Sequence, residues 1–303
     1  MVARFARGFL LIELAVYAAV AAWLMKLGLA WAAALGCVLG IALLYRLAAV
    51  AGTFVLAAAL SPAGRAAPCS ALQRARLVAR EVLWASLAYG LFMSFPRVFV
   101  RPRPRPPRDP AILPVLLVHG YVCNSGIWAG MQRFLASRGV DGYTHDLEPL
   151  DADIDDYAAG LERRIEAVCA ATGAAKLVVV AHSMGGLAAR AYLRARGGAR
   201  VAKLVTLGTP HHGTLLARIG IGTNARQMEP GSDWLAGLGR AAPPEVPVAS
   251  IYSAHDNIVV PQESAALESA ANVRISGIGH VSLPFARSVQ ERVLGEILAC
   301  GAH

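Results

Sequence analysis

The sequence predicts an α/β protein in which an apolar helical hairpin precedes a doubly wound, mostly parallel sheet. Three observations support this prediction. Residues 1–62 hold apolar runs long enough to cross a bilayer, residues 63–110 end in a segment rich in arginine and proline, and residues 111–303 alternate short apolar runs with amphipathic helical patterns. Strands that alternate with helices build parallel sheets with helices on both faces. We therefore expect a membrane-anchoring segment, a linker and one larger domain.

Apolar and basic residues are concentrated in the N-terminal third. The mean hydropathy is +0.48, and most of the net charge of +9 lies before residue 110. Basic residues beside apolar runs favour contact with anionic lipid headgroups, and no nucleic-acid-binding module is recognisable. We expect a bilayer as a partner and no nucleic acid, while the oligomeric state stays open. The five cysteines are irregularly spaced and predict neither a disulfide framework nor a metal site.

Two apolar runs, at about 9–25 and 27–45, predict two transmembrane helices joined near Lys26 and Gly28. At 1.5 Å per residue, each run reaches about 25–30 Å, close to the hydrocarbon thickness of a bilayer. Glu13 interrupts the first run near its start, where its carboxylate can reach the interface or face the partner helix. A cleaved secretory signal would also explain the first run, but the second run directly behind it favours an anchor.

A third apolar run, 47–60, is too short to predict a span by itself. It either extends the second helix or lies on the membrane surface. With two spans, the arginines on both sides place the ends of the hairpin, and the domain behind it, on the cytoplasmic side of the cell or inner membrane. A third span would reverse that side.

The linker 63–110 contains an apolar stretch, 81–95, that predicts a helix lying on the membrane or on the following domain. The segment RPRPRPPR follows at 101–108. Its alternating prolines exclude helix and sheet ladders and favour an extended polyproline II spacer. We place the domain boundary at this spacer.

Residues 111–303 contain the pattern of strands and helices. One helix is predicted over 153–172, with acids in its first turn where the helix dipole favours them. A last helix is predicted over 282–300, with Ser282 as its cap and Pro284 in its first turn. Short apolar runs predict strands at 115–119, 143–147, 177–181, 201–207, 248–253 and 273–276.

The sharpest local pattern is a buried strand that runs through Ala-His-Ser-Met-Gly-Gly into a helix, over 177–193. A turn this tight needs small residues two positions before and after Ser183, and Ala181 and Gly185 meet that need. The segment resembles the nucleophile elbow of the α/β-hydrolase superfamily, in particular of bacterial lipases and esterases, although the family has glycine where Ala181 stands. The resemblance implies that Ser183 is a nucleophile and that the N–H of Met184 binds an oxyanion. The alternative is a serine that caps a helix in an ordinary turn.

A second motif closes the first strand of the domain, at His119-Gly120 in VLLVHGYVCNSGIW. It looks like the His-Gly motif of lipases and esterases. By that resemblance, the N–H of Tyr121 is the second oxyanion donor, and Gly120 allows the chain to turn back sharply. We expect His119 to organise this loop and not to act as a base, although a histidine at a strand end can also belong to the core.

A serine nucleophile needs a base and an acid that orients it. The superfamily places them after the serine in the order acid, then histidine. His280 follows a candidate strand as Gly-His and precedes the last helix, which is the position of the base in the family. Asp256 is the preferred acid, because Asp-x-x-Val-x-Pro over 256–261 resembles the family's acid loop. Asp233 and Glu263 are the fallback acids.

About forty residues, 211–247, separate two of the predicted strands. A connection of this length is usually functional, and we interpret it as a small cap over an acyl pocket. The alternative is a surface excursion that packs on the core. The sequence LGTPHHGT, at 207–214, leads into this segment and looks like the Gly-Thr-Pro segment of lipases. We expect the substrate pocket to be lined by His119, Trp128, His211, His212 and Leu215.

The resemblance implies a hydrolase that cleaves carboxylic esters through an acyl-enzyme on Ser183. An anchor in the bilayer favours lipid acyl esters as substrates. An acyltransferase or a thioesterase could use the same three residues, and a scaffold with an inactive hydrolase fold is the non-enzymatic alternative. Some lipases of this type bind calcium through aspartates near the acid and the histidine, but none follows His280 closely. We therefore predict no metal and no cofactor.

Overall fold

The computed structural model describes residues 1–61, 67–101, 109, 112–241 and 245–301. Within this part of the chain, six strands form one sheet in the order β2-β1-β3-β4-β5-β6, and every neighbouring pair is parallel. Each strand lies at a predicted position, with bounds shifted by a few residues at most. The strands are β1 (Val115–Val118), β2 (Gly142–His145), β3 (Leu177–His182), β4 (Val201–Leu207), β5 (Val248–Ser253) and β6 (Ala271–Ile275).

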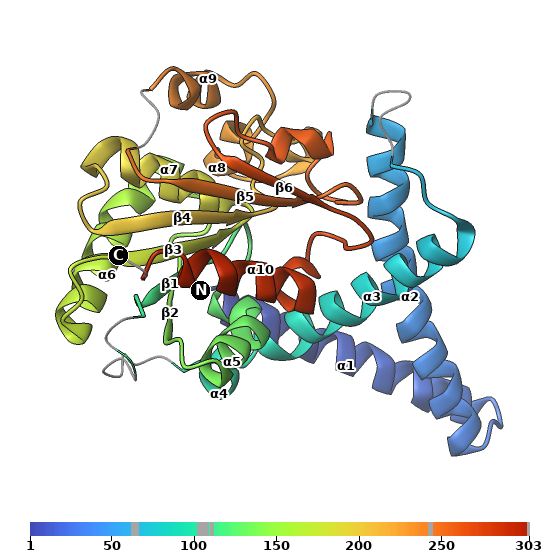
Figure 1. Ribbon diagram of the computed structural model, residues 1–303. Coiled ribbons are helices and arrows are strands. Elements are labelled where there is room, and N and C mark those ends of the chain that lie inside the picture. Colours follow the sequence, from blue (N-terminus) through green and yellow to red (C-terminus); the bar gives the residue numbers. More distant parts are fainter. Residues whose placement is uncertain (62–66, 102–108, 110–111, 242–244, 302–303) are drawn as a thin grey trace.

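Helices cover both faces of the sheet, as the doubly wound class requires (Figure 1). Successive residues of a strand point to opposite faces. Leu116 of β1 accordingly joins one core cluster and Leu117 the other. The first cluster includes side chains of α6 (Tyr157–Thr172) and α7 (Met184–Arg196). The second includes side chains of α5 (Ala129–Ser137) and α10 (Arg287–Leu298).

The predicted helix at 153–172 begins with a 3-10 turn over Ile154–Asp156 and continues as α6. Asp153 lies at the start, where its side chain accepts a hydrogen bond from the N–H of Asp155 at 2.9 Å. Gly173 ends α6 with a φ of +73°, a left-handed conformation that glycine adopts without strain. The acids before α6 therefore have the structural role that the sequence predicts.

The prediction of one helix over 282–300 is wrong at its start. A 3-10 turn over Leu283–Phe285 comes first, and α10 begins only at Arg287 because Ala286 has an extended backbone. Ser282 caps neither helix with its side chain. Its hydroxyl donates a hydrogen bond to the carboxylate of Glu81 instead, so a tertiary contact replaces the local cap.

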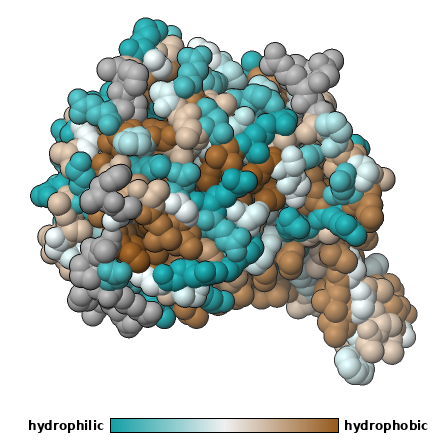
Figure 2. Space-filling model, in the orientation of Figure 1, coloured by the Kyte–Doolittle hydropathy of each residue, from teal (hydrophilic) through white to brown (hydrophobic). Residues whose placement is uncertain are grey.

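Among the described residues, two N-terminal helices are long and apolar enough to cross a membrane: α1 (Val2–Lys26) and α2 (Trp31–Leu60). They pair as a hairpin with its tip near Gly28 and extend away from the sheet (Figure 1). The apolar run 47–60 continues the second helix, which was one of the two predicted outcomes. Glu13 faces the partner helix, where Arg46 Nη2 donates to its carboxylate at 3.0 Å. Figure 2 shows the hairpin as a largely hydrophobic projection.

The apolar stretch 81–95 lies on the larger domain. It contributes to α3 (Ala71–Leu87), a π-helical turn over Ala88–Phe92 and the start of α4 (Pro96–Phe99). The Trp84 ring stacks on Phe285 with a centroid separation of 4.5 Å and an angle of 4° between the planes. This aromatic contact fixes α3 against the turn before α10. The predicted polyproline II segment lies almost wholly outside the described residues.

The connection between β4 and β5 contains a 3-10 turn over Leu215–Ile219 and two short helices, α8 (Thr223–Gln227) and α9 (Asp233–Arg240). α9 packs against α7, on one side of the sheet. Tyr121 ties this connection to the loop after β1, because its hydroxyl donates to the carbonyl of Ile221 at 2.6 Å and accepts from the same residue's N–H at 2.9 Å.

Candidate active site

Ser183 occupies the sharp turn between β3 and α7. Its φ of 55° and ψ of −132° are unfavourable for a residue with a side chain, and such strain persists only where the surroundings enforce it. The main-chain N–H of Ser183 donates to the carbonyl of Leu207 on β4 at 2.9 Å. Ser183 therefore has the strained backbone that the predicted elbow requires.

Small neighbours allow this turn to pack against the loop after β1. A Cβ atom at Gly185 would collide with the carbonyl oxygens of His119 and Val118, the latter at 2.7 Å. A Cβ atom at Gly120 would lie 2.6 Å from Ser183 Cβ. The two glycines thus bring the two predicted motifs into direct contact.

The two predicted oxyanion donors lie on the two sides of this contact. Met184 is the first residue of α7, so its N–H has no partner inside the helix and lies at the positive end of the helix dipole. Tyr121 follows Gly120, where a Cβ atom would lie 3.2 Å from Ser183 Oγ. This arrangement is suitable for stabilising negative charge beside Ser183 Oγ.

His119 organises the loop after β1. Its Nε2 accepts a hydrogen bond from the N–H of Leu147 at 3.0 Å, which leaves Nδ1 to donate to the carbonyl of Gly120 at 2.9 Å. Burial lowers the pKa of His119, which favours the neutral ring that this pattern requires. Both ring nitrogens are thus occupied by the main chain, as expected for a residue that orders the loop.

The predicted base and acid are paired and buried. His280 Nδ1 lies 2.8 Å from Asp256 Oδ2. The other oxygen of Asp256 accepts from the N–H groups of Ile258 and Val259, each at 2.8 Å. The carboxylate is therefore fixed by its own loop, and it directs His280 so that Nε2 is left for a second partner.

The environment of His280 favours its protonated form. Burial alone would lower the pKa of His280, but the charge and the hydrogen bond of Asp256 and the charge of Glu81 outweigh it. The net result is a pKa raised above the ordinary value of about 6.5. A buried imidazole with this electrostatic support is suited to accept and hold a proton.

The paired residues lie close to the elbow. Gly208 directly follows Leu207, the hydrogen-bond acceptor of Ser183, and a Cβ atom there would lie 3.3 Å from His280 Nδ1. His182, the residue before Ser183, donates from Nε2 to the carbonyl of His280 at 3.1 Å, and the two rings lie 4.6 Å apart. Among the described residues, the structure gives no hydrogen bond between Ser183 Oγ and the His280 ring. Such bonds commonly tighten only when substrate is bound.

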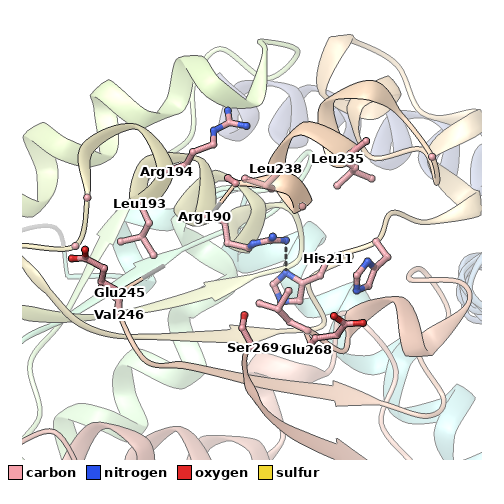
Figure 3. Close-up of a pocket in the computed structure, with 18 residues that line it drawn as sticks. Arg190, Leu193, Arg194, His211, Leu235, Leu238, Glu245, Val246, Glu268 and Ser269 are labelled. Atoms are coloured by element: carbon pink, nitrogen blue, oxygen red, sulfur yellow. Dashed lines mark hydrogen bonds between the residues drawn. The ribbon is translucent and has the colours of Figure 1, made fainter. Parts of the chain in front are cut away.

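Two of the predicted pocket residues lie in a cavity of about 730 Å³ between α7, α9 and the loops flanking β5 (Figure 3). His211 and His212 both line it, but none of the three predicted catalytic residues does. His211 is also held from both sides: Nδ1 lies 3.4 Å from Arg190 Nη1, and Nε2 lies 3.1 Å from Thr206 Oγ1.

Two other predicted pocket residues, Trp128 and Leu215, are buried or half-buried. Trp128 is fully buried and lies edge-on to the His182 ring at 6.4 Å. Leu215 is half-buried, and its N–H donates to the carbonyl of Val260 in the acid loop at 2.8 Å. Neither of the fallback acids contacts His280: Asp233 opens α9, and Glu263 pairs with Arg274 at 3.5 Å.

Two residues beside the pair were not predicted to belong to the site. Glu81, on α3, accepts hydrogen bonds from the main chain immediately after His280. Asn257 Oδ1 accepts from the N–H of His280 at 2.9 Å. One signal was available for Glu81: it and Glu13 are the only acidic residues before Asp109. Within the described part of the chain, no cluster of three or more His, Cys, Asp or Glu side chains could hold a metal ion.

Comparisons with known proteins agree with this geometry. Residues 114–229 match a family model described as the alpha/beta hydrolase fold. A triacylglycerol lipase of Burkholderia plantarii is 34% identical over 158 residues, which cover 48% of this chain and 43% of that protein. One of Pseudarthrobacter phenanthrenivorans is 37% identical over 112 residues, which cover 34% of this chain and 35% of that protein. The chain thus spans less than half the length of the curated relatives it matches.

Two solved structures resemble this chain over a larger share of its length. The mature form of a Bacillus licheniformis lipase superposes with a TM-score of 0.57, covering 65% of this chain and 96% of that chain. The propeptide form of the same lipase gives 0.56 over 65% of this chain and 52% of that chain. At 21% identity in both cases, these matches show a shared fold.

Proposed function

Because this chain carries an α/β-hydrolase domain related to lipases and esterases, we propose that it hydrolyses carboxylic esters through an acyl-enzyme on Ser183. The observation that carries the proposal is the joint placement of a serine at a strained turn and a buried His280–Asp256 pair beside it. In the proposal, the nucleophile, the orienting acid and the base follow the carboxyl ends of β3, β5 and β6, which are parallel strands of one sheet.

In the proposed reaction, His280 Nε2 takes the proton of Ser183 Oγ as that oxygen attacks the ester carbonyl carbon. The N–H groups of Tyr121 and Met184 bind the resulting oxyanion, and one such donor contributes about 3–4 kcal/mol to the stability of the transition state. His280 then gives the proton to the departing alcohol. Water, deprotonated by the same imidazole, hydrolyses the acyl-enzyme and restores Ser183.

We further propose that the enzyme works at a membrane on lipid acyl esters. α2 has 30 residues and a length of about 45 Å, which exceeds the roughly 30 Å of hydrocarbon in a bilayer. The end of α2 can therefore leave the membrane and contact the catalytic domain while the tip of the hairpin stays inserted. Large apolar side chains of α1 such as Phe5, Phe9 and Leu11 are exposed, as lipid contact requires. The triacylglycerol lipases among the relatives support an acyl ester as substrate.

The proposal is tested with the full chain in detergent or vesicles. A panel of p-nitrophenyl esters with acyl chains from two to sixteen carbons measures hydrolysis, and a fluorophosphonate probe measures labelling of the nucleophile. We expect hydrolysis and labelling in the wild type and the loss of both in Ser183→Ala. Labelling that persists in Ser183→Ala would contradict the assignment of the nucleophile. Preference for the longer chains would support lipid substrates.

The same assay, with acceptor alcohols present, separates hydrolysis from acyl transfer. Both reactions use the same acyl-enzyme and differ only in whether water or an alcohol removes the acyl group. Free acid as the main product supports the hydrolase. A new ester as the main product would assign the chain to acyl transfer.

A further inference from the structure

Glu81 is a buried carboxylate on α3 that faces the loop carrying His280. It is 1% exposed, although it belongs to the helical region before the hydrolase domain. Unpaired carboxylates are almost never buried to this degree, because the loss of hydration costs several kcal/mol. The contacts that stabilise the buried Glu81 carboxylate therefore indicate its role in the structure.

The carboxylate of Glu81 accepts hydrogen bonds from the two residues after His280. Oε1 accepts from the N–H of Val281 at 2.7 Å. Oε2 accepts from the N–H and the hydroxyl of Ser282, at 3.1 and 2.5 Å. A Cβ atom at Gly279 would lie 2.5 Å from Glu81 Cδ, so the glycine before His280 is needed for the carboxylate to approach. Glu81 thus holds the main chain immediately after His280 by hydrogen bonds and lies close to Gly279 immediately before it.

The charge of Glu81 also acts on the imidazole. The charged and titratable groups that face His280 are Asp256 in the loop after β5, Glu81 on α3 and His182 at the end of β3. Those that face Glu81 are His280, Asp256 and Tyr89. The pKa of Glu81 is raised above its ordinary value, chiefly by burial and also by the charge of Asp256. The hydrogen bonds from Ser282 and Val281 and the charge of His280 oppose this shift and favour the charged carboxylate. The imidazolium that forms during catalysis would thus have two carboxylates near it.

A second contact joins the N-terminal helices to the same loops. Asn257 Oδ1 accepts a hydrogen bond from the N–H of His280. Asn257 is in turn bonded to α2, because its Nδ2 donates to Thr53 Oγ1 at 2.7 Å. His280 is therefore held through its neighbours by α3 on one side and by α2 on the other.

We propose that Glu81 is a positioning residue for the base: the carboxylate on α3 fixes the main chain around His280 so that Nε2 meets Ser183, and its charge stabilises the protonated ring. The inference rests on the proposed function, since it assigns His280 the role of base. It also makes the N-terminal helices part of the catalytic apparatus and not only an anchor.

The alternative is that Glu81 merely fills a polar site that holds α3 in place. Three variants of the full chain separate the two ideas. Glu81→Gln removes the charge with little change in shape, Glu81→Asp keeps the charge but shortens the reach, and Glu13→Gln is the matched control that removes the only other acid of the N-terminal region. Each variant is assayed for the pH profile of kcat/KM, for kcat and KM separately, and for the pKa of His280 by NMR with 15N-labelled histidine.

For Glu81→Gln, we expect kcat to fall on the order of 10- to 100-fold with a smaller change in KM, as for a misplaced catalytic group. The acid limb of kcat/KM and the NMR titration of His280 should both move to lower pH. Glu81→Asp should lower kcat but leave the acid limb near that of the wild type. Glu13→Gln should leave the limb and the His280 titration unchanged.

Rates are normalised to the number of sites that react with the fluorophosphonate probe, so a partly unfolded variant does not imitate a catalytic defect. If Glu81→Gln does not fold, Glu81→Asp still tests the positioning role. The expected result is then a lower kcat while the acid limb of the kcat/KM profile stays near that of the wild type. Wild-type kcat and an unmoved His280 titration in Glu81→Gln would overturn the inference. A wild type that fails to react with the probe would instead overturn the proposed function.

Discussion

The residues around Ser183 are constrained by contact distances that leave no room for a methyl group. Gly185 lies under the carbonyl oxygens of Val118 and His119, and Gly120 lies against the Ser183 side chain. The strained φ of Ser183 is kept because these neighbours and the hydrogen bond to Leu207 fix the turn. Steric fit, more than any single bond, thus sets the direction of the Ser183 hydroxyl.

Gly185→Ala should therefore destabilise the fold and lower the activity. The new methyl group has to displace the main chain at Val118, and overpacking of this kind typically costs about 1–3 kcal/mol. Thermal unfolding, followed by circular dichroism, measures the change. Gly295→Ala on α10 is the matched control, because no atom lies within 4 Å of its Cβ position, and it should stabilise by up to about 1 kcal/mol. A Gly185→Ala melting temperature equal to that of the wild type would refute the steric argument.

The raised pKa of His280 predicts the pH dependence of the reaction. A base must be unprotonated to accept the proton of Ser183, so kcat/KM should rise with pH, with a midpoint above the ordinary histidine value of about 6.5. Asp256→Asn removes the charge and the acceptor at 2.8 Å, so its acid limb should move to lower pH while kcat falls about 10³–10⁴-fold. Steady-state kinetics from pH 5 to 9 measures both effects. An acid limb unchanged in Asp256→Asn would exclude Asp256 as the acid.

The same raised pKa has a consequence for stability. The protonated ring is favoured in the folded chain, so the contribution of His280 to folding is fully present below about pH 6.5. It is lost as the pH rises through the higher pKa of the folded state.

At the scale of elements, α2 and α3 are connected by specific polar contacts to the loops that carry Asp256 and His280. α3 also stacks Trp84 on Phe285, in the turn that leads from His280 to α10. Helix packing and polar contacts at one place make the position of the helices and the position of the base interdependent. The distorted start of α10 follows from this arrangement, since Ser282 bonds Glu81 and does not cap a helix.

Thr53→Val tests the contribution of α2. Valine has nearly the same shape but cannot accept the hydrogen bond of Asn257 Nδ2, so a buried donor loses its partner at a cost of about 1–3 kcal/mol. We expect lower thermal stability and a reduced kcat. Thr53→Ser keeps the hydroxyl and should retain the wild-type kcat. Equal kcat values in Thr53→Val and Thr53→Ser would show that the α2 contact does not reach the base.

At the scale of the whole molecule, a hydrophobic hairpin projects from the larger domain that contains the sheet (Figures 1 and 2). The first turn of α1 and the last third of α2 both contact that domain: Val2 is buried, and Thr53 bonds Asn257. The tip with Lys26 and Gly28 lies at the far end. In our proposal the tip crosses the bilayer, so that Lys26 and the hydrolase domain lie on opposite sides.

This topology is tested by cysteine labelling in sealed membrane vesicles. A membrane-impermeant maleimide should label Lys26→Cys, in a background of Cys69→Ser and Cys300→Ser, from one side only. In the chain that keeps native Cys69, the maleimide should label this cysteine from the other side, because Cys69 lies just before α3 and is partly exposed. Labelling of both positions from the same side would contradict two spans.

The sequence alone was sufficient to predict the class of fold, and it named the candidate site residues that the structure brings together. Buried β-branched runs such as Leu177–His182 determine central parallel strands by composition, and small residues around Ser183 reflect a local steric need. The structure accordingly pairs the predicted base and acid at 2.8 Å. The helix start at Ser282 was mispredicted because a capping signal is local and cannot reveal a competing partner about 200 positions away.

The sequence by itself determined the fold class, the apolar hairpin and the candidates for nucleophile, base and acid, because each depends on periodicity or on a local motif. Only the tertiary structure decided which polar residues of the N-terminal helices meet the catalytic loops. Thr53 lies in an apolar helix with no local pattern that distinguishes it, and the rarity of acidic residues near Glu81 does not reveal its partner. Their roles follow from burial, since a charged or polar group removed from water must find its partners wherever the packing of the chain brings them.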